Sequence, residues 1–394
     1  MFNNFNKSNL NILLLGYGKS NKAVFKYFNN KENIYVLNTL NKKDYFKFLK
    51  ELPLFDICFR SPGIKINSPI YTLGYLLSKQ FTNELVYALD KINCNKKIVI
   101  TGSNGKTSLC MLLFKVLSYF NKTFLCGNIG ETLIDKIELI NKNDYLLVEA
   151  SSFQLENLNT NIDIGIIKNL FPNHLNSTYN LSTYYASKKR IKLFSDYIID
   201  DINSESIYIN NNYLYVDNEK YINIIELENK EQTNIDNIII CLKVLKKLKL
   251  EYKKIKDIFI KNTNIMHRNN VYKYKDITFV DDGKSTSSSA SKYCISLYKG
   301  ERIIILGGIH KSDKFNLNLT DKDKVYIYGK DRYKILKEIK KGETYLTLNE
   351  VLNNIKPKQN QIVIFSPGAS SLDQYENYKK RSEEFLKWVN KWKK

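Results

Sequence analysis

Short apolar runs followed by helical segments recur along this chain. The run Asn11–Leu15 precedes a helical pattern over Ala23–Phe28 and a second apolar run at Ile34–Leu37. The same order returns at Lys97–Ile100 and Ser108–Phe120. A strand–helix–strand order favours parallel sheets, because two parallel strands need a crossover segment between them. The sequence therefore predicts an α/β fold.

The segment Thr101–Thr107, with the sequence TGSNGKT, joins one predicted strand to the helix after it. Main-chain N–H groups of such a turn, together with a helix N-terminus, attract anionic oxygens. Lys106 would neutralise phosphate charge, and the Thr107 hydroxyl would be available to Mg²⁺. The spacing is GxxGKT rather than GxxxxGKT, because Ile100 stands where the longer motif has its first glycine. The context predicts a phosphate-binding loop, and an ordinary glycine turn is the alternative.

The predicted strands form three groups along the 394 residues, a length that suits two or three domains. We expect a Rossmann-like N-terminal domain over residues 1–92. A central domain of the phosphate-loop ATPase type should cover residues 93–264, with an antiparallel hairpin within Tyr208–Ile225. A C-terminal Rossmann-like domain should cover residues 265–394.

The N-terminal glycine turn, Gly16 to Asn21, has part of a dinucleotide-binding fingerprint. Asn21 replaces its third glycine, and Asn38 stands where an acidic residue would bind a ribose. We therefore expect no nicotinamide cofactor, although the helix start could bind another diphosphate.

Polar side chains gather where the predicted strand Tyr145–Glu149 ends. Glu149 itself is a candidate ligand for Mg²⁺, and a surface glutamate is the alternative. Ser151 and Gln154 follow at the same sheet edge, where ligands of parallel sheets bind. The helical run Tyr184–Ile191 carries a basic face that by itself indicates only a solvated surface.

Composition excludes several other classes. The net charge of +21 could indicate nucleic-acid binding, but the lysines are spread along the chain without a basic block. The six cysteines show no CxxC spacing, which is typical of reduced thiols in a cytosolic protein without a zinc site. The polar start MFNNFNKSNL and the lack of an 18-residue apolar run predict neither a signal peptide nor a membrane span. We expect a cytoplasmic protein that binds neither nucleic acid nor membranes.

An ordered set of motifs extends over almost the whole chain. After TGSNGKT come GNIG (127–130), EASSFQLE (149–156), NLFPNHLN (169–176) and YYASKKRI (184–191). Later come HR (267–268), DDGKSTS (281–287), LGGIHKSDKF (306–315) and SPGASSLDQYENYKKR (366–381). This set resembles the Mur ligase family of peptidoglycan synthesis. The segments SSFQLE and SLDQY are similar to those of the members that add D-glutamate.

The resemblance implies an ATP-dependent amide ligase of cell-wall biosynthesis. ATP would phosphorylate the carboxylate of UDP-MurNAc-L-Ala, and the amine of D-glutamate would attack the resulting acyl phosphate. Such a reaction depends on charge neutralisation and alignment. The N-terminal domain would bind UDP, the central domain ATP and the C-terminal domain the amino acid. We expect two Mg²⁺ ions and a monomer.

The resemblance also implies roles for individual residues around ATP. The phosphates would be held by Gly102, Ser103, Asn104, Gly105, Lys106, Thr107 and Ser108. The rest of the nucleotide would contact Asn234, Asn237, Arg268, Asp282 and Lys284. Mg²⁺ would be bound by Thr107, Glu149, His174 and Lys188, with Lys188 carbamylated so that it offers an anionic oxygen. Lys106, His174 and Lys188 would act in catalysis.

The two substrates would be bound by further positions. UDP would contact Ser20, Thr39, Ser61 and Gly63. The muramoyl-alanine part would contact Asn128, Ser151 and Gln154, and D-glutamate would contact Lys311, Ser371, Leu372 and Tyr378.

Five features depart from the family pattern: Leu40, Asn173, Asn176, Asn270 and the segment Asp282–Thr286. None removes an expected Mg²⁺ ligand. Leu40 stands where an arginine is expected and weakens the uridine assignment. Two alternatives stay open, a ligase of the same superfamily with another acceptor, such as a folylpolyglutamate synthase, and a nucleotide-binding protein without catalysis.

Overall fold

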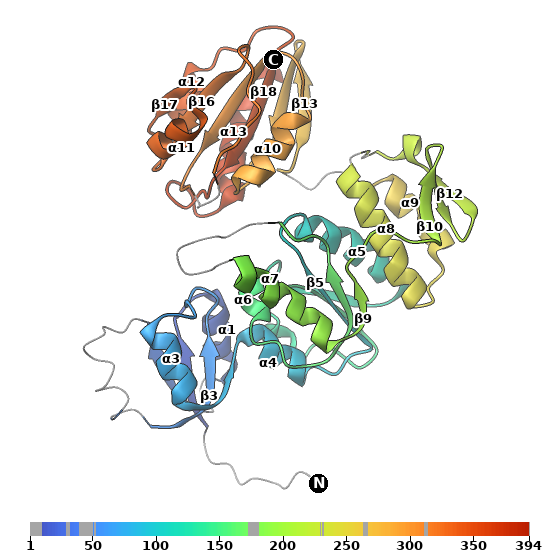
Figure 1. Ribbon diagram of the computed structural model, residues 1–394, viewed down its shortest axis with the longest axis vertical. Coiled ribbons are helices and arrows are strands. Elements are labelled where there is room, and N and C mark those ends of the chain that lie inside the picture. The colour runs from blue at the N-terminus through green and yellow to red at the C-terminus, as the bar shows by residue number, and fades with distance from the viewer. Residues whose placement is uncertain are drawn as a thin grey trace. The chain divides into compact units, whose positions relative to one another are not determined.

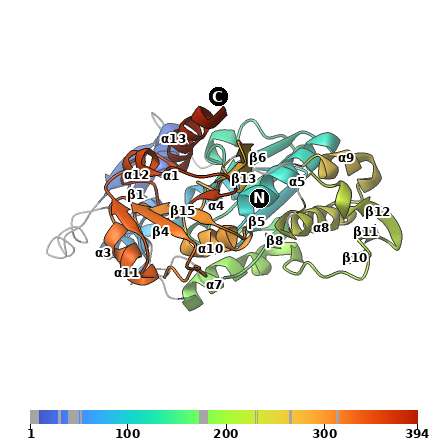
Figure 2. The ribbon, with the colours of Figure 1, turned by 90° about the horizontal axis from the view of Figure 1, so that it is seen from above.

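In the computed structural model the chain divides into two compact units (Figures 1 and 2). One comprises residues 1–171 and 178–262, and the other comprises residues 172–177 and 263–394. The structure describes residues 10–28, 32–38, 50, 53–171, 181–228, 230, 232–262, 267–310 and 314–393.

The first unit begins with a four-stranded parallel sheet in the order β2-β1-β3-β4. Its strands are β1 (Asn11–Leu15), β2 (Asn33–Leu37), β3 (Phe55–Arg60) and β4 (Ser78–Thr82). Its helices are α1 (Lys19–Phe28), α3 (Pro69–Leu76) and α4 (Glu84–Lys91). Apolar residues such as Ile12, Val24 and Phe59 are fully buried between sheet and helices.

A five-stranded parallel sheet follows in the order β6-β7-β5-β8-β9. Its strands are β5 (Lys96–Thr101), β6 (Thr123–Gly127), β7 (Tyr145–Glu149), β8 (Ile162–Ile167) and β9 (Ser195–Ile199). Its helical elements are α5 (Lys106–Phe120), η2 (Ile134–Lys136), α6 (Ser152–Leu155), α7 (Leu181–Lys189) and η3 (Arg190–Phe194). The phosphate-loop segment lies between β5, at the centre of this sheet, and α5.

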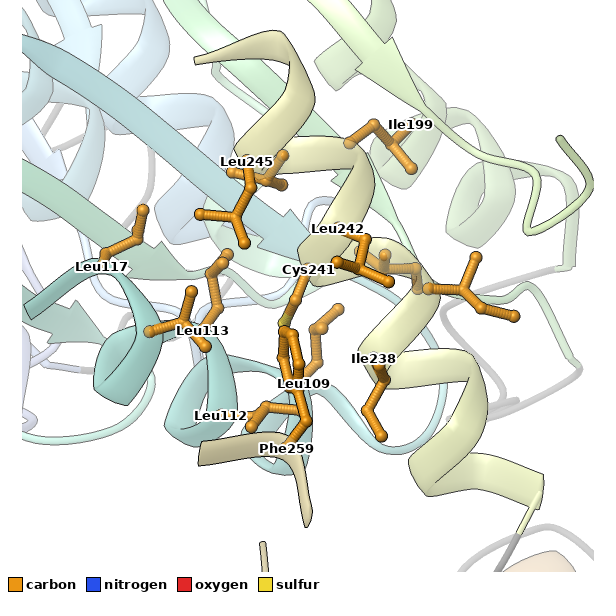
Figure 3. Close-up of a cluster of buried hydrophobic side chains, with 14 of the residues drawn as sticks. Leu109, Leu112, Leu113, Leu117, Ile199, Ile238, Cys241, Leu242, Leu245 and Phe259 are labelled. Atoms are coloured by element: carbon orange, nitrogen blue, oxygen red, sulfur yellow. The ribbon is translucent and has the colours of Figure 1, made fainter. Parts of the chain in front are cut away.

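The first unit ends in a small antiparallel sheet and helices that cover α5. The sheet contains β10 (Ile207–Asn210), β11 (Tyr213–Val216) and β12 (Glu219–Asn223), as the hairpin prediction required. After η4 (Ile224–Glu226) come α8 (Gln232–Lys247), η5 (Tyr252–Ile255) and α9 (Lys256–Ile260). Leu109 and Leu113 of α5 are buried in one cluster with Cys241 and Leu242 of α8 and Phe259 of α9 (Figure 3). This packing fixes the helix that begins at the phosphate loop.

The second unit is a six-stranded sheet in the order β13-β14-β18-β15-β16-β17, with only the β13–β14 pair antiparallel. Its strands are β13 (Asn270–Tyr274), β14 (Ile277–Asp281), β15 (Arg302–Gly307), β16 (Lys324–Tyr328), β17 (Glu343–Tyr345) and β18 (Ile362–Gly368). Its helices are α10 (Ser288–Ser296), α11 (Arg332–Ile339), α12 (Leu348–Asn354), α13 (Tyr378–Val389) and η6 (Asn390–Lys393).

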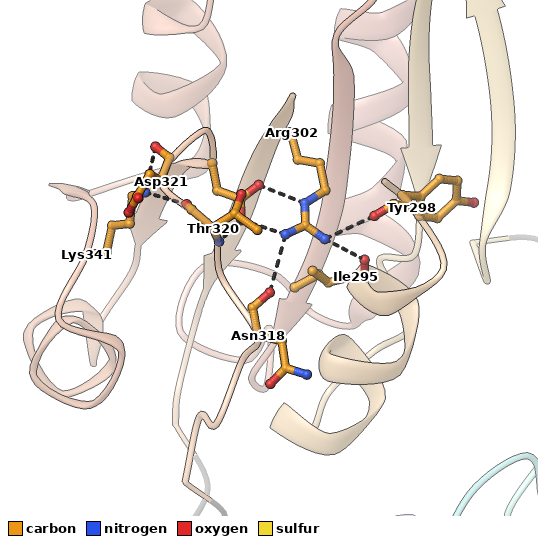
Figure 4. A network of polar contacts seen from close by, with 8 residues as sticks. Ile295, Tyr298, Arg302, Asn318, Thr320, Asp321 and Lys341 are labelled. Atoms are coloured by element: carbon orange, nitrogen blue, oxygen red, sulfur yellow. Dashed lines mark hydrogen bonds and ion pairs between the residues drawn. The ribbon is translucent and has the colours of Figure 1, made fainter. Parts of the chain in front are cut away.

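A buried arginine secures the start of β15 (Figure 4). Nε and Nη2 of Arg302 donate to the two carboxylate oxygens of Asp323 at 2.7 and 2.6 Å. The same guanidinium donates to the carbonyls of Ile295, Tyr298 and Asn318. A guanidinium so fully satisfied ties α10 and the segment before β16 to the amino end of the sheet.

The predicted α/β class with parallel sheets is confirmed. The strands Tyr145–Glu149 and Lys324–Tyr328 have the predicted bounds, whereas the first helix begins at Lys19 rather than Ala23. None of the six cysteines, all of which lie in the described ranges, forms a disulfide bond. In the described ranges no helix has the length and apolar character needed to cross a bilayer.

Candidate active site

Two glycines give the loop between β5 and α5 its shape. Gly105 forms the N-cap of α5 with a φ of 75°, and Gly102 has a φ of 156°. Residues with a Cβ atom rarely adopt such angles. A Cβ atom at Gly105 would also lie 2.8 Å from Cε of Lys168. The turn therefore requires glycine, and it runs directly into the positive end of a helix, as an anion site requires.

Two lysine side chains share one carbonyl of this loop. Nζ of Lys106 and Nζ of Lys188 each donate to the carbonyl of Gly102 at 2.8 Å. Lys188 comes from α7 and is only 2% exposed. Burial and the nearby charge of Lys106 lower the pKa of Lys188 to about 7, while Glu149 acts in the opposite direction. Because two ammonium groups so close together repel each other, the site favours loss of the Lys188 proton or an anion beside the two amines.

Glu149, at the end of β7, provides an unsatisfied carboxylate oxygen. The side chain is 2% exposed, and its Oε1 accepts a hydrogen bond from Nδ2 of Asn128 at 3.1 Å. Its Oε2 is buried and accepts no hydrogen bond from the residues that the structure describes. A buried carboxylate oxygen without a donor fits a ligand of Mg²⁺.

The other expected metal ligands are placed only in part. Thr107 lies in the first turn of α5, and Lys188 reaches the same loop from α7. His174, together with the departures Asn173 and Asn176, lies outside the described residues. Within those residues no group of three or more His, Cys, Asp or Glu side chains could hold a metal ion.

Two residues that the sequence analysis did not identify form hydrogen bonds with the loop through their side chains. Oδ1 of Asn169 accepts from the main-chain N–H groups of Ser103 and Asn104 at 3.0 and 2.9 Å. The hydroxyl of Tyr184 donates to Oγ of Ser103 at 2.9 Å. Both residues lie inside quoted motifs, NLFPNHLN and YYASKKRI, so a signal for them was present.

Lys168 was also missed, and it connects the loop to α8. Its stem passes close to Gly105, and its ammonium donates to Oδ1 of Asn237, which is buried. Because a lysine can only donate, this contact orients the Asn237 amide with its oxygen toward Lys168. Asn234, the other residue expected near the adenine, accepts from Nδ2 of Asn262 at 2.7 Å.

The residues expected to contact the muramoyl-alanine part lie close to Glu149. The main-chain N–H of Asn128 donates to the Glu149 carbonyl at 2.8 Å. Ser151 is the N-cap of α6 and forms a reciprocal capping box with Gln154. The structure therefore brings Asn128, Ser151 and Gln154 to the same sheet edge as the phosphate loop.

The residues expected to bind UDP adjoin the N-terminal glycine turn. Ser20 lies in the first turn of α1, and Ser61 follows β3. A Cβ atom at Gly18 would lie 3.1 Å from Oγ of Ser61, so the two loops touch. Gly63 faces open space. Thr39 and Leu40 lie outside the described residues.

Asn21, which departs from the dinucleotide fingerprint, has a structural role. Its Nδ2 donates to the carbonyls of Leu15, Gly16 and Phe59 at 3.0, 2.8 and 3.1 Å. The side chain is buried and ties the turn after β1 to β3. A glycine there would leave these buried carbonyls without this donor.

The second unit carries the remaining predicted site residues. Asp282 follows β14, is buried, and accepts from the hydroxyls of Ser285 and Ser366 at 2.5 and 2.6 Å. Burial raises the pKa of Asp282, and these hydrogen bonds oppose the rise. Nζ of Lys284 lies 5.8 Å from the ring centroid of Tyr378, a cation–π distance that brings two predicted residues together.

Four further predicted residues complete the description of this unit. The main-chain N–H of Arg268 donates to Oδ1 of Asn270 at 3.2 Å. Ser371 is buried, whereas Leu372 beside it is 67% exposed. An exposed leucine is available for contact with a ligand or partner. Lys311 lies outside the described residues.

This chain is similar to known proteins in both sequence and fold. The family model described as the Mur ligase middle domain matches residues 100–272. Two relatives, both called UDP-N-acetylmuramoylalanine–D-glutamate ligase, come from Francisella tularensis subsp. tularensis (strain FSC 198) and subsp. novicida (strain U112). Each is 31% identical to this chain, over 96% of this chain and 95% of the relative.

Solved structures show the same fold at low sequence identity. A UDP-N-acetylmuramate–alanine ligase from Thermotoga maritima matches with a TM-score of 0.60 and 16% identity, over 97% of this chain and all of that one. A folylpolyglutamate synthase/dihydrofolate synthase from Yersinia pestis CO92 matches with a TM-score of 0.56 and 11% identity, over 77% and 92% of the two chains. Because its identity to the Francisella ligases extends over nearly its whole length, this chain belongs to the Mur ligase family, in the group of the UDP-N-acetylmuramoylalanine–D-glutamate ligases.

Proposed function

We propose that this chain is an ATP-dependent ligase that joins D-glutamate to UDP-MurNAc-L-Ala in peptidoglycan synthesis. The observation that carries the proposal is the convergence of Lys106, Lys188 and the orphan oxygen of Glu149 around one glycine loop. A cation at a helix N-terminus, beside a metal-binding carboxylate and a lysine that loses its proton easily, fits what phosphoryl transfer requires. The Francisella relatives carry the name of this activity.

The residues of the first unit would bind the phosphates, the Mg²⁺ ions and the adenine. The loop from Gly102 to Ser108 would hold the ATP phosphates, with Lys106 neutralising charge that develops during transfer. Thr107, Glu149, His174 and a carbamylated Lys188 would hold two Mg²⁺ ions, which supply charge neutralisation to the phosphates. Asn234 and Asn237 would orient the adenine.

The substrates would be held at the other predicted positions. The UDP part would lie against Ser20, Thr39, Ser61 and Gly63, and the L-alanyl part against Asn128, Ser151 and Gln154. The second unit would supply Arg268, Asp282 and Lys284 to the nucleotide. Lys311, Ser371, Leu372 and Tyr378 would bind D-glutamate. We further propose a cytoplasmic monomer whose functional domains are 1–92 for UDP, 93–264 for ATP and 265–394 for the amino acid.

A coupled ADP-release assay over a panel of acceptors and amino acids tests this function. We expect turnover with ATP, UDP-MurNAc-L-Ala and D-glutamate, and none when L-glutamate or a folate acceptor is substituted. Turnover with another pair alone would favour a ligase of different specificity. The variant Lys106→Met should lose roughly 10²–10³-fold in kcat, as when one electrostatic stabiliser is removed. Lys115→Met, an exposed lysine of the same helix, is the matched control.

A further inference from the structure

Two segments are expected to contact muramoyl-alanine, one that contains Asn128 and one that contains Ser151 and Gln154. Side chains at the carboxyl edge of the N-terminal sheet hold the main chain of both segments. We propose that they are positioning residues for the acceptor, and we name them the acceptor clamp: Lys19, Arg60, Asn83 and Glu84. The inference rests on the proposed function. It concerns contacts within the first unit only.

The short helix α6 requires partners from outside itself. It has four residues, and the last carbonyls of any helix lack partners within the helix. Nη2 of Arg60 donates to the Phe153 carbonyl at 2.8 Å, and Nδ2 of Asn83 donates to the Gln154 carbonyl at 2.9 Å. A helix of one turn is unstable alone, so these two donors define where α6 lies.

An ion pair strengthens this attachment. Nη1 of Arg60 contacts the carboxylate of Glu156, which follows α6 directly. Arg60 is 1% exposed, and its guanidinium also lies over the ring of Tyr71 at 5.6 Å. Separating a buried pair leaves both charges uncompensated, so movement of α6 away from Arg60 is strongly disfavoured. The position of Ser151 and Gln154 therefore depends on a residue at the end of β3.

The loop after β6 is held in the same way. Oε1 of Glu84 accepts from the main-chain N–H of Ile134 at 2.8 Å, and Nζ of Lys19 donates to the Gly130 carbonyl at 3.0 Å. Asn128 lies between β6 and these two attachment points. Lys19 is the first residue of α1, where a cation is unfavourable to the helix dipole. The contact with the loop offsets that cost.

Two of the four clamp residues are direct neighbours of expected UDP contacts. Lys19 precedes Ser20, and Arg60 precedes Ser61. In each of these pairs, the first side chain holds an acceptor segment and the next is expected to contact the nucleotide. A misplacement of about 1 Å in a substrate-positioning group can cost roughly 10²-fold in rate. The clamp should therefore affect the use of the acceptor rather than the affinity for UDP.

Two variants each remove a single donor, and their thermal unfolding checks that each one is folded. Lys19→Met alters an exposed side chain. Asn83→Asp removes the Nδ2 donor but retains the Oδ1 acceptor that caps α4 through the N–H of Val86. Lys79→Met is the matched control, because Lys79 lies on β4 of the same sheet, is 71% exposed, and pairs only with Asp56 among the described residues.

Hydrogen exchange of the free enzyme tests the clamp without any substrate. In Lys19→Met we expect faster amide exchange in peptides that cover residues 128–134. In Asn83→Asp we expect it in peptides that cover residues 152–158. Lys79→Met should exchange like the wild type in both regions. In kinetics we expect a tenfold or larger loss of kcat/KM for UDP-MurNAc-L-Ala. The KM for ATP and the Kd for UDP, measured by titration calorimetry, should stay within twofold.

Unchanged exchange in both variants would overturn the clamp. A parallel loss of UDP affinity would also overturn it, because Lys19 would then be a UDP contact. An equal loss in every kinetic parameter would overturn it as well. If the wild-type enzyme neither bound nor used UDP-MurNAc-L-Ala, the proposed function would fail. The exchange measurement would still decide whether these side chains hold the two segments.

Discussion

Lys188 should be a neutral amine at a pH where an ordinary lysine is charged, and this makes it open to carbamylation. Only a neutral amine can add to carbon dioxide. Burial and the charge of Lys106 lower its pKa from 10.5 to about 7. At pH 8 about 90% of Lys188 would then be neutral, against about 0.3% of an ordinary lysine. The neutral fraction is therefore higher by roughly 300-fold.

The free enzyme, supplied with ¹³C-labelled carbon dioxide at a fixed dissolved concentration, provides the assay. The carbamate carbonyl is followed by ¹³C NMR in the wild type and in Lys188→Met, which should lack the signal. The initial rate should rise about tenfold from pH 6 to pH 8 and then level off, as the neutral fraction does for a pKa of about 7.

Two variants test the cause of the shift. Lys106→Met removes a like charge and should move the midpoint to higher pH, whereas Glu149→Gln removes the opposing influence and should move it lower. A rate that keeps rising tenfold per pH unit through pH 9 would refute the reasoning, since Lys188 would then titrate like a lysine in water.

The remaining predictions concern stability and nucleotide binding. Because folding lowers the pKa of Lys188, its protonation below pH 7 destabilises the fold, and the penalty is relieved as the pH rises above about 7. In urea unfolding, the wild type should therefore gain about 3 kcal/mol relative to Lys188→Met between pH 6 and pH 9. Unfolding free energies that change equally with pH in the two proteins would contradict this. Lys168→Met should weaken ADP binding about tenfold in calorimetry, because the Asn237 amide loses the donor that fixes its orientation. Lys97→Met is the control and should leave ADP binding unchanged, since Lys97 of β5 donates to the Leu89 carbonyl instead. Leu113→Ala should cost about 2–5 kcal/mol of unfolding free energy, because the side chain is fully buried between α5 and α8, and a loss below about 1 kcal/mol would show that this core collapses around the gap.

The sequence by itself determined the features that depend on residues close together in the chain. The turn at Thr101–Thr107 follows from glycines between an apolar run and a helical pattern, because residues with a Cβ atom rarely adopt the angles found at Gly102 and Gly105. Alternating strands and helices dictated parallel sheets, and the order of the motifs was enough to indicate the ligase family.

Tertiary structure decided which distant residues meet. Asn21 looks like a defect in a glycine motif, yet it binds carbonyls of two strands, one of them 38 residues away. Arg60 reaches Glu156 across 96 residues, and Lys19 reaches Gly130 across 111. No local pattern marks such pairs, because a side chain's partner depends on how the sheets pack. The lowered pKa of Lys188 has the same origin, since burial and the charge of Lys106 exist only in the folded chain.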